Sequence, residues 1–134
     1  MEINGGCHCG YISYQAEIDP DKITVCHCTD CQTLSGSAFR WVAPTREGTF
    51  KLPAGELKIY VKTAESGAKR PQSFCPECGT PIYATSAEAN PKSHGLRVGS
   101  ISQRDKLVPT RQVWARSEQQ WVADLKTLPR VEKR

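Results

Sequence analysis

The spacing of its seven cysteines is the most informative feature of this chain. They form three groups, which read Cys7-x-Cys9, Cys26-x-Cys28-x-x-Cys31 and Cys75-x-x-Cys78. An odd number of cysteines cannot all pair within one molecule, and disulfides are rare in reducing compartments. Cysteines one or two residues apart are instead spaced so that a short loop can direct both sulfurs to one zinc ion, about 2.3 Å away. The spacing therefore predicts metal binding.

The seven sulfurs divide most simply into a group of four and a group of three. Two cysteine pairs together would form a closed tetrahedral zinc site, with the ligands Cys7, Cys9, Cys75 and Cys78. Zinc bound by four thiolates is structural and contributes roughly 10 kcal/mol or more to folding, which is comparable with the whole stability of a small domain. This interpretation makes the first and third cysteine groups a single structural centre.

The middle group, Cys26, Cys28 and Cys31, leaves a second ion with an open fourth position. Three protein ligands and one open position are typical of a catalytic zinc, where water or substrate completes the coordination. Two alternatives stay open: a histidine could close the site, or Cys28 and Cys31 could act as a C-x-x-C thiol switch. The histidines available for closing it are His8, His27 and His94. No general base is assigned from the sequence.

The length of 134 residues corresponds to a single domain over residues 1–134. With 38% hydrophobic and 24% charged residues, the composition is that of an ordinary globular protein and excludes a disordered tail. No apolar run approaches the ~20 residues that a membrane span needs. The first residues, MEINGGCHCG, lack the basic start and the apolar stretch of a signal peptide. We therefore expect a cytoplasmic protein without membrane contact.

The net charge of +4 is concentrated in the last quarter of the chain. Residues 97–134 carry nine Lys and Arg against four Asp and Glu, whereas residues 1–96 carry nine against ten. A basic C-terminal surface keeps open a second class of function, a non-catalytic zinc-stapled binding module. Nucleic acid is not favoured as its partner, because the basic residues are scattered and form no stripe interleaved with aromatic side chains.

Alternating and short apolar segments predict a chain made mainly of β-strands. Residues 11–18 alternate between apolar and polar, as do residues 57–62, and this is the period of a half-buried strand. Further short runs rich in β-branched and aromatic residues, separated by Gly and Pro, lie at 39–43, 80–84, 96–101 and 111–115. The three tryptophans are expected in the core or covering a sheet; they are Trp41, Trp114 and Trp121.

Two segments carry helix signals. Residues 29–32 match a capping box at the start of a short helix that ends at Gly36. Near the end of the chain, residues 117–120 match a second capping box, and apolar side chains follow at helical spacing from Trp121 to Leu125. We expect this second segment to be a helix packed on the sheet.

Four segments in order, GGCHCGYISY, CHCTDCQTLSGSAFRW, SFCPECGTPIY and VWARSEQQWV, resemble the signatures of the glutathione-dependent formaldehyde-activating enzyme family, whose domain also occurs in centromere protein V. The resemblance spans about residues 3–125. It implies a β-tent fold of stacked antiparallel sheets, a structural zinc on the group of four cysteines and a catalytic zinc on Cys26, Cys28 and Cys31. It also implies a carbon–sulfur lyase similar to S-(hydroxymethyl)glutathione synthase, which joins formaldehyde to glutathione. Where many members have a basic residue after the third cysteine, this chain has Gln32.

The expected chemistry is the addition of a thiol to an aldehyde and its reversal. A thiol that enters the open position of the second zinc loses its proton on binding, and the gain over the spontaneous reaction comes mainly from positioning the two partners. The candidates for substrate contacts are Ser35, Gly36, Ser37 and Phe39. The expected partners are glutathione or a similar small thiol and an aldehyde, and an exposed sheet edge is compatible with a homodimer. Two zinc sites are expected, and the occupancy of the second is left open.

Overall fold

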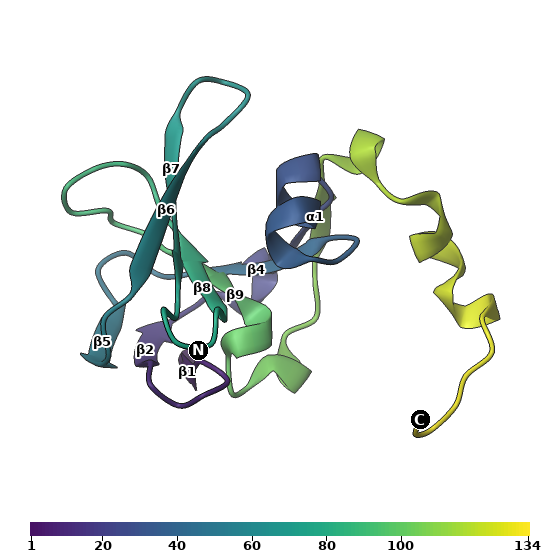
Figure 1. Cartoon of the computed structure of the whole chain (residues 1–134), viewed down its shortest axis with the longest axis horizontal. Coiled ribbons are helices and arrows are strands. Elements are labelled where there is room, and N and C mark those ends of the chain that lie inside the picture. Colours follow the sequence, from purple (N-terminus) through teal and green to yellow (C-terminus); the bar gives the residue numbers. More distant parts are fainter.

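Two β-sheets form the framework of the molecule (Figure 1). The computed structural model describes residues 1–134. The smaller sheet has the strand order β1-β2-β5, with β1 (Glu2–Gly6), β2 (Ser13–Glu17) and β5 (Lys51–Ala54). The larger sheet has the order β10-β3-β4-β9-β8-β7-β6, and its strands are β3 (Thr24–Cys26), β4 (Arg40–Pro44), β6 (Lys58–Thr63), β7 (Lys69–Phe74), β8 (Pro81–Ala84), β9 (Gly95–Arg97) and β10 (Arg111–Val113). The predicted mainly-β class is confirmed.

Helical structure is limited to one short α-helix and several 3₁₀ turns. The α-helix is α1 (Thr29–Ser35). The 3₁₀ segments are η1 (Pro20–Lys22), η2 (Val98–Ser100), η3 (Arg104–Lys106), η4 (Ala115–Ser117) and η5 (Gln120–Thr127). None of them combines the length and the apolar character that a membrane-crossing helix requires.

The hydrophobic core joins the two sheets. On β2 and its flanks the predicted alternation is confirmed, because Ile12, Tyr14, Ala16 and Ile18 are all buried while the residues between them are not. These side chains belong to the same cluster as Leu96 and further residues of the larger sheet. Inward side chains of a half-exposed strand recur every second residue, which is why the periodicity of this segment was a reliable signal.

The strand β6 forms where the alternation predicts it, but it is not half-buried. Ile59, Tyr60 and Val61 are 45%, 54% and 49% exposed. β6 is the edge strand of the larger sheet, and Figure 1 shows that its hairpin with β7 extends past the neighbouring strands. The burial prediction for this segment is therefore wrong, because periodicity indicates a strand but not whether another layer covers it.

The short helix α1 is confirmed, although it begins within the cysteine triplet rather than after it, and its residues make contacts beyond the helix. Its N-cap is Cys28, whose Sγ accepts a hydrogen bond from the Cys31 amide at 3.2 Å, so the cap lies one residue before the predicted one. The Gln32 side chain does not close a capping box. It donates instead to the carbonyl oxygens of His27 at 2.8 Å and Ser117 at 2.9 Å. The helix ends at Gly36, whose φ of 66° suits a residue without a Cβ.

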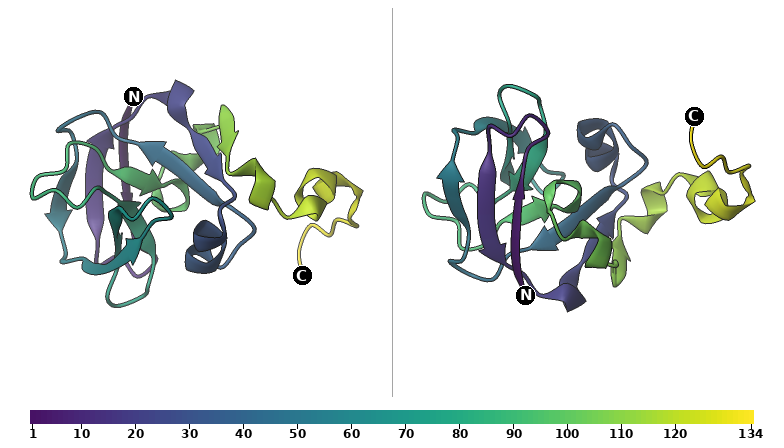
Figure 2. Two further views of the ribbon diagram at one scale, coloured as in Figure 1. Left: turned by 90° about the horizontal axis from the view of Figure 1, so that it is seen from above. Right: turned by 90° about the horizontal axis from the view of Figure 1, so that it is seen from below.

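The C-terminal segment is not the packed α-helix that its pattern predicts. η5 is a 3₁₀ segment with a kink at Asp124, and no side chain caps its start. Trp121 and Leu125 are 52% and 47% exposed, and Figures 1 and 2 show this part of the chain projecting away from both sheets. Short helices are marginal in water without a packing partner, and here the apolar stripe has none. Trp41 packs against the core, but the prediction is wrong for Trp121 and for Trp114, which is 43% exposed.

Candidate functional site

Four cysteine sulfurs converge between the two sheets. The Sγ atoms of Cys7, Cys9, Cys75 and Cys78 all lie within 4.8 Å of one another. The Sγ atom of Cys9 lies 3.5 Å from that of Cys7 and 3.8 Å from that of Cys75. A tetrahedral zinc with Zn–S bonds of about 2.3 Å places its sulfurs about 3.8 Å apart. The geometry of this group therefore fits a zinc ion.

The position of the four-cysteine group explains what it would stabilise. Cys7 and Cys9 follow β1 of the smaller sheet, whereas Cys75 and Cys78 lie in the turn between β7 and β8 of the larger sheet. Backbone amides direct two of the sulfurs, since the Ile12 amide donates to Cys7 Sγ at 3.2 Å and the Glu77 amide donates to Cys75 Sγ at 3.4 Å. Hydrogen bonds of this kind orient metal ligands. An ion held here would link the two sheets.

The other three cysteines form a second group at the start of α1. Cys26 is the last residue of β3, Cys28 caps the helix and Cys31 lies in its first turn, so their sulfurs also lie within 4.8 Å of one another. The hydrogen bond from the Cys26 thiol lowers the pKa of Cys31 to about 5, with further contributions from Cys28 and from the Arg40 guanidinium. The same hydrogen bond raises the pKa of Cys26. Three half-buried sulfurs with a readily formed thiolate suit a soft divalent cation such as zinc.

No histidine nitrogen joins this group of three sulfurs. The buried His27 ring forms a hydrogen bond through Nε2 with Gln112 Oε1 at 2.7 Å. The His94 ring packs on Phe50 with centroids 4.4 Å apart, and burial lowers its pKa. His8 lies on the loop of the four-cysteine group. The geometry therefore leaves three protein ligands at the second site, and all seven cysteines are free thiols.

A basic cavity of about 620 Å³ lies beside the triplet and is lined in part by Cys26 and Cys31. Six basic side chains and one acidic side chain, Glu88, also line it. The basic residues are Arg40, Lys62, Arg70, Lys92, Arg97 and Arg111. Both lysines form ion pairs, at 3.1 Å with Asp30 and 3.5 Å with Glu47, but none of the four arginines is paired with a carboxylate. The cavity therefore has an excess of positive charge.

Strand pairing explains why arginines surround the cysteines. Cys26 on β3 lies opposite Arg40 on β4, and Val42 on β4 lies opposite Arg97 on β9. Side chains opposite each other in an antiparallel pair share a face, as do residues two apart on one strand. The intervening residues, such as Ala43, face the core. The larger sheet thus has one apolar face and one basic face.

Two of these arginines are largely enclosed by protein. Arg40 is only 4% exposed although it lies on the face away from the core. Arg97 donates through Nη2 to Gln72 Oε1 at 2.6 Å. Burial lowers the pKa of Arg97 to about 10, and the positive charge of Arg40 contributes to the same shift. The two guanidinium groups therefore lie close enough to repel each other.

The four residues predicted to contact substrate do not line this cavity; they are Ser35, Gly36, Ser37 and Phe39. The Ser35 hydroxyl lies near the carbonyl oxygens of Gln32 and Phe39, at 3.4 and 3.5 Å, and the Phe39 ring lies against His27. The residues of α1 that do line the cavity are Cys31 and Leu34. The strand arginines were missed, although an arginine inside a short apolar strand, as in FRWVA and GLRVG, is itself a signal of a functional charge.

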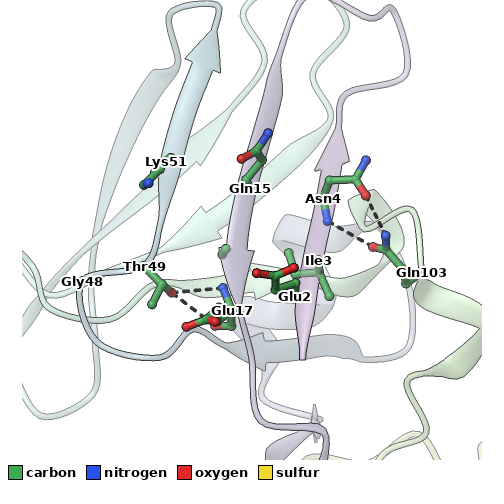
Figure 3. A pocket seen from close by; sticks show the side chains of 10 residues that line it. Glu2, Ile3, Asn4, Gln15, Glu17, Gly48, Thr49, Lys51 and Gln103 are labelled. Carbon is green, nitrogen blue, oxygen red and sulfur yellow. Dashed lines mark hydrogen bonds between the residues drawn. The ribbon is translucent and has the colours of Figure 1, made fainter.

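A second hollow, of about 680 Å³, lies on the outer face of the smaller sheet (Figure 3). Its lining is mostly polar, with Glu2, Gln15 and Lys51 pointing outward from three adjacent strands. At its edge the backbone N–H of Asn4 donates to Gln103 Oε1 at 3.1 Å, and Gln103 Nε2 donates to Asn4 Oδ1 at 2.6 Å. It contains no cysteine or histidine and has no set of groups that would hold a metal. The chemistry therefore concentrates at the triplet.

Comparisons with known proteins identify the family and the fold of this chain. The model of the glutathione-dependent formaldehyde-activating enzyme family matches residues 2–117. An uncharacterised lyase of Schizosaccharomyces pombe is 29% identical over 82 residues, which are 61% of this chain and 56% of that protein, so the match spans little more than half of the relative's length. A crystal structure of a Rhodobacter sphaeroides protein has a similar fold, with a TM-score of 0.62 at 21% identity, and the match covers 82% of this chain and 99% of the other. Because the family model covers most of the sequence, this chain belongs to the glutathione-dependent formaldehyde-activating enzyme family.

Proposed function

We propose that the protein is a zinc-dependent carbon–sulfur lyase that forms and cleaves adducts between a thiol such as glutathione and an aldehyde such as formaldehyde. The observation that carries this proposal is the group of three cysteine sulfurs, without a fourth protein ligand, at the wall of a basic cavity. Membership of the family supports it, and so does the name lyase given to the yeast relative. A cytoplasmic location, a β-tent arrangement of the sheets and two zinc sites are parts of the same proposal.

Each part of the site has a role in this proposal. A zinc ion held by Cys26, Cys28 and Cys31 would supply a position at which a substrate thiol gives up its proton. Arg40 and Arg97 would offset the negative charge of the three thiolates. Arginine donates two parallel hydrogen bonds to a carboxylate, so the arginines further along the basic face, Arg70 and Arg111, would hold the carboxylates of a peptide thiol.

The protein would accelerate the reaction mainly by positioning the two reactants. Addition of a thiol to an aldehyde also proceeds in water, so the chain gains rate by holding the sulfur and the carbonyl carbon in contact at one orientation. The cavity volume of about 620 Å³ is within the range of small-molecule sites, which is roughly 300–1,000 Å³. It therefore has room for a tripeptide thiol and a small aldehyde together. The missing basic residue at position 32 is not needed for anion binding, because Gln32 ties α1 to the C-terminal segment and the sheet supplies the charge.

Exchange spectroscopy tests the proposal, because formaldehyde and its glutathione adduct have separate NMR signals. Zinc-loaded wild-type protein should accelerate their interconversion above the spontaneous rate. The Cys31→Ser variant should not, while it keeps the zinc of the four-cysteine site. If fully loaded wild type fails to accelerate the exchange for every thiol and aldehyde in a small panel, the lyase proposal is wrong and the binding module becomes the better account.

A further inference from the structure

Arg40 is the one residue among the lysines, arginines, aspartates and glutamates that is buried. Only 4% of its surface is exposed, yet its guanidinium forms no ion pair with a carboxylate. Its Nε is buried without any hydrogen-bond partner. The guanidinium lies beside Cys31, but this contact leaves the Nε–H without an acceptor. A buried donor without an acceptor is costly, so Nε indicates a missing acceptor.

The cysteine thiolates do not supply enough negative charge to balance this region. Three thiolates around one divalent cation have a formal charge of −1, whereas Arg40 and Arg97 together contribute +2. Arg70 and Arg111 add to the excess, and Glu88 is the single acidic residue of the lining. The site is therefore built to receive an anion, with its charge concentrated next to the sulfurs.

The position of Arg40 restricts which anion this is. Arg40 lies opposite Cys26 in the strand pairing and neighbours Cys31, so its partner must lie close to the atoms that react. In a peptide thiol such as glutathione, each carboxylate is separated from the sulfur by a peptide unit, which places it further along the basic face. A carboxylate bonded directly to the carbonyl carbon, in contrast, lies one bond from the point of attack.

We infer that the carbonyl substrate is an α-oxo carboxylate, held through its carboxylate by Arg40 and Arg97, with Gln72 fixing the orientation of Arg97. This inference rests on the proposed function and names its substrate class. The sulfur of the thiol forms a bond to the carbonyl carbon, and the π electrons of the carbonyl move to its oxygen. That oxygen takes the proton released by the thiol, so the product is an α-hydroxy-α-thio carboxylate and nothing is oxidised or reduced. The reverse step returns thiol and oxo acid.

Binding is tested separately from turnover. Glycolate carries a carboxylate on a hydroxylated carbon and cannot add a thiol, so it probes the site alone. In zinc-loaded protein, glycolate should shift the Arg40 Nε–H resonance, because that proton has no partner in the free site. Uncharged ethylene glycol should not. Absence of any Arg40 shift at saturating glycolate and glyoxylate would overturn the inference.

A second experiment compares the turnover of glyoxylate with that of formaldehyde at the same glutathione concentration. Arg97→Gln, and Arg40→Lys if that variant folds and retains zinc, should lower kcat/KM for glyoxylate by about tenfold or more, which is the loss expected for a hydrogen bond to a charged group. Formaldehyde turnover should change much less, because it has no carboxylate. Lys51→Gln on the smaller sheet removes one positive charge away from the cysteines and serves as the matched control.

The outcomes distinguish failure of the α-oxo carboxylate site from failure of the lyase activity. Equal losses toward both aldehydes overturn the inference, since the arginines would then only balance the thiolates. Acceleration with formaldehyde but not with glyoxylate also overturns it and leaves the proposed function intact. Glycolate binding at Arg40 without acceleration for either aldehyde supports the carboxylate site and contradicts the lyase activity.

Discussion

Cys26 and Arg40 lie directly opposite each other in the antiparallel pairing of β3 and β4. This single register places a proposed metal ligand and a buried guanidinium on the same face of the larger sheet. It also brings Arg40 to the neighbouring thiol, Cys31, at the start of α1. The proposed metal site and the proposed anion site therefore both depend on the pairing of β3 with β4.

Replacing Arg40 should weaken metal binding at the triplet. In Arg40→Met the positive charge beside Cys31 is lost, and changes to groups around metal ligands typically cost about 10–100-fold in affinity. Competition with a chelator of known affinity measures this loss, and the four-cysteine site should retain its zinc. Arg111→Met, in the same cavity, is the matched control and should leave the affinity within about threefold. Equal effects of both variants would contradict a specific role for Arg40.

The two cysteine groups should respond differently to the same chemical change. Cys75→Ser removes a fully buried ligand of the group that links the sheets, so the domain should lose cooperative thermal unfolding together with a binding energy of roughly 10 kcal/mol. Cys31→Ser should keep a cooperative transition and lose only the second zinc. Circular dichroism and zinc content measure both. Comparable destabilisation by the two variants would mean that both ions are structural.

The C-terminal segment should contribute little to stability. Deletion of residues 121–134 removes exposed side chains such as Trp121 and Leu125, while it spares the hydrogen bond between Gln119 and Gln32. The melting temperature should change by less than about 3 °C, because exposed residues without buried contacts contribute little. A larger fall that persists at low protein concentration, where association is weakest, would show that this segment packs against its own domain and would contradict the prediction.

His94 should make folding stability depend on pH. Burial lowers its pKa in the folded protein, so below the ordinary value of about 6.5 the unfolded chain binds the extra proton more readily. Stability due to this residue is therefore present above pH ~6.5 and is lost as the pH falls toward the folded pKa. Denaturant unfolding at pH 5.5 and 7.5 should show a larger loss for wild type than for His94→Gln. The exposed His8→Gln variant should behave as wild type; a loss in His94→Gln equal to that of wild type would contradict this assignment.

How far the sequence predicts this structure depends on whether the signal is local. Cysteine spacing predicts the two groups, and the alternation around Tyr14 predicts β2, because both signals lie within one short segment. The basic face could not be predicted in the same way. Arg40, Arg97 and Arg111 are far apart in the chain, and only the strand order β10-β3-β4-β9 brings them together.

The same distinction explains the two errors of burial. The pattern at 57–62 predicts a strand correctly, but its exposure depends on β6 being an edge of the sheet. The pattern after Ser117 has an apolar stripe at helical spacing, but no surface of the body lies against it. Amphipathic patterns report which side of an element is apolar, and tertiary contacts decide whether that side is covered.

If the four-cysteine site is closed and structural while the triplet site is open to a substrate thiol, the two sites should release zinc differently. Zinc release from the loaded protein to a coloured chelator, followed with and without glutathione, measures this difference. Two zinc ions per chain are expected: one released early at a rate that glutathione changes, and one retained until the domain unfolds. Release of both ions together only on unfolding, with no effect of glutathione, would show that both sites are closed and structural.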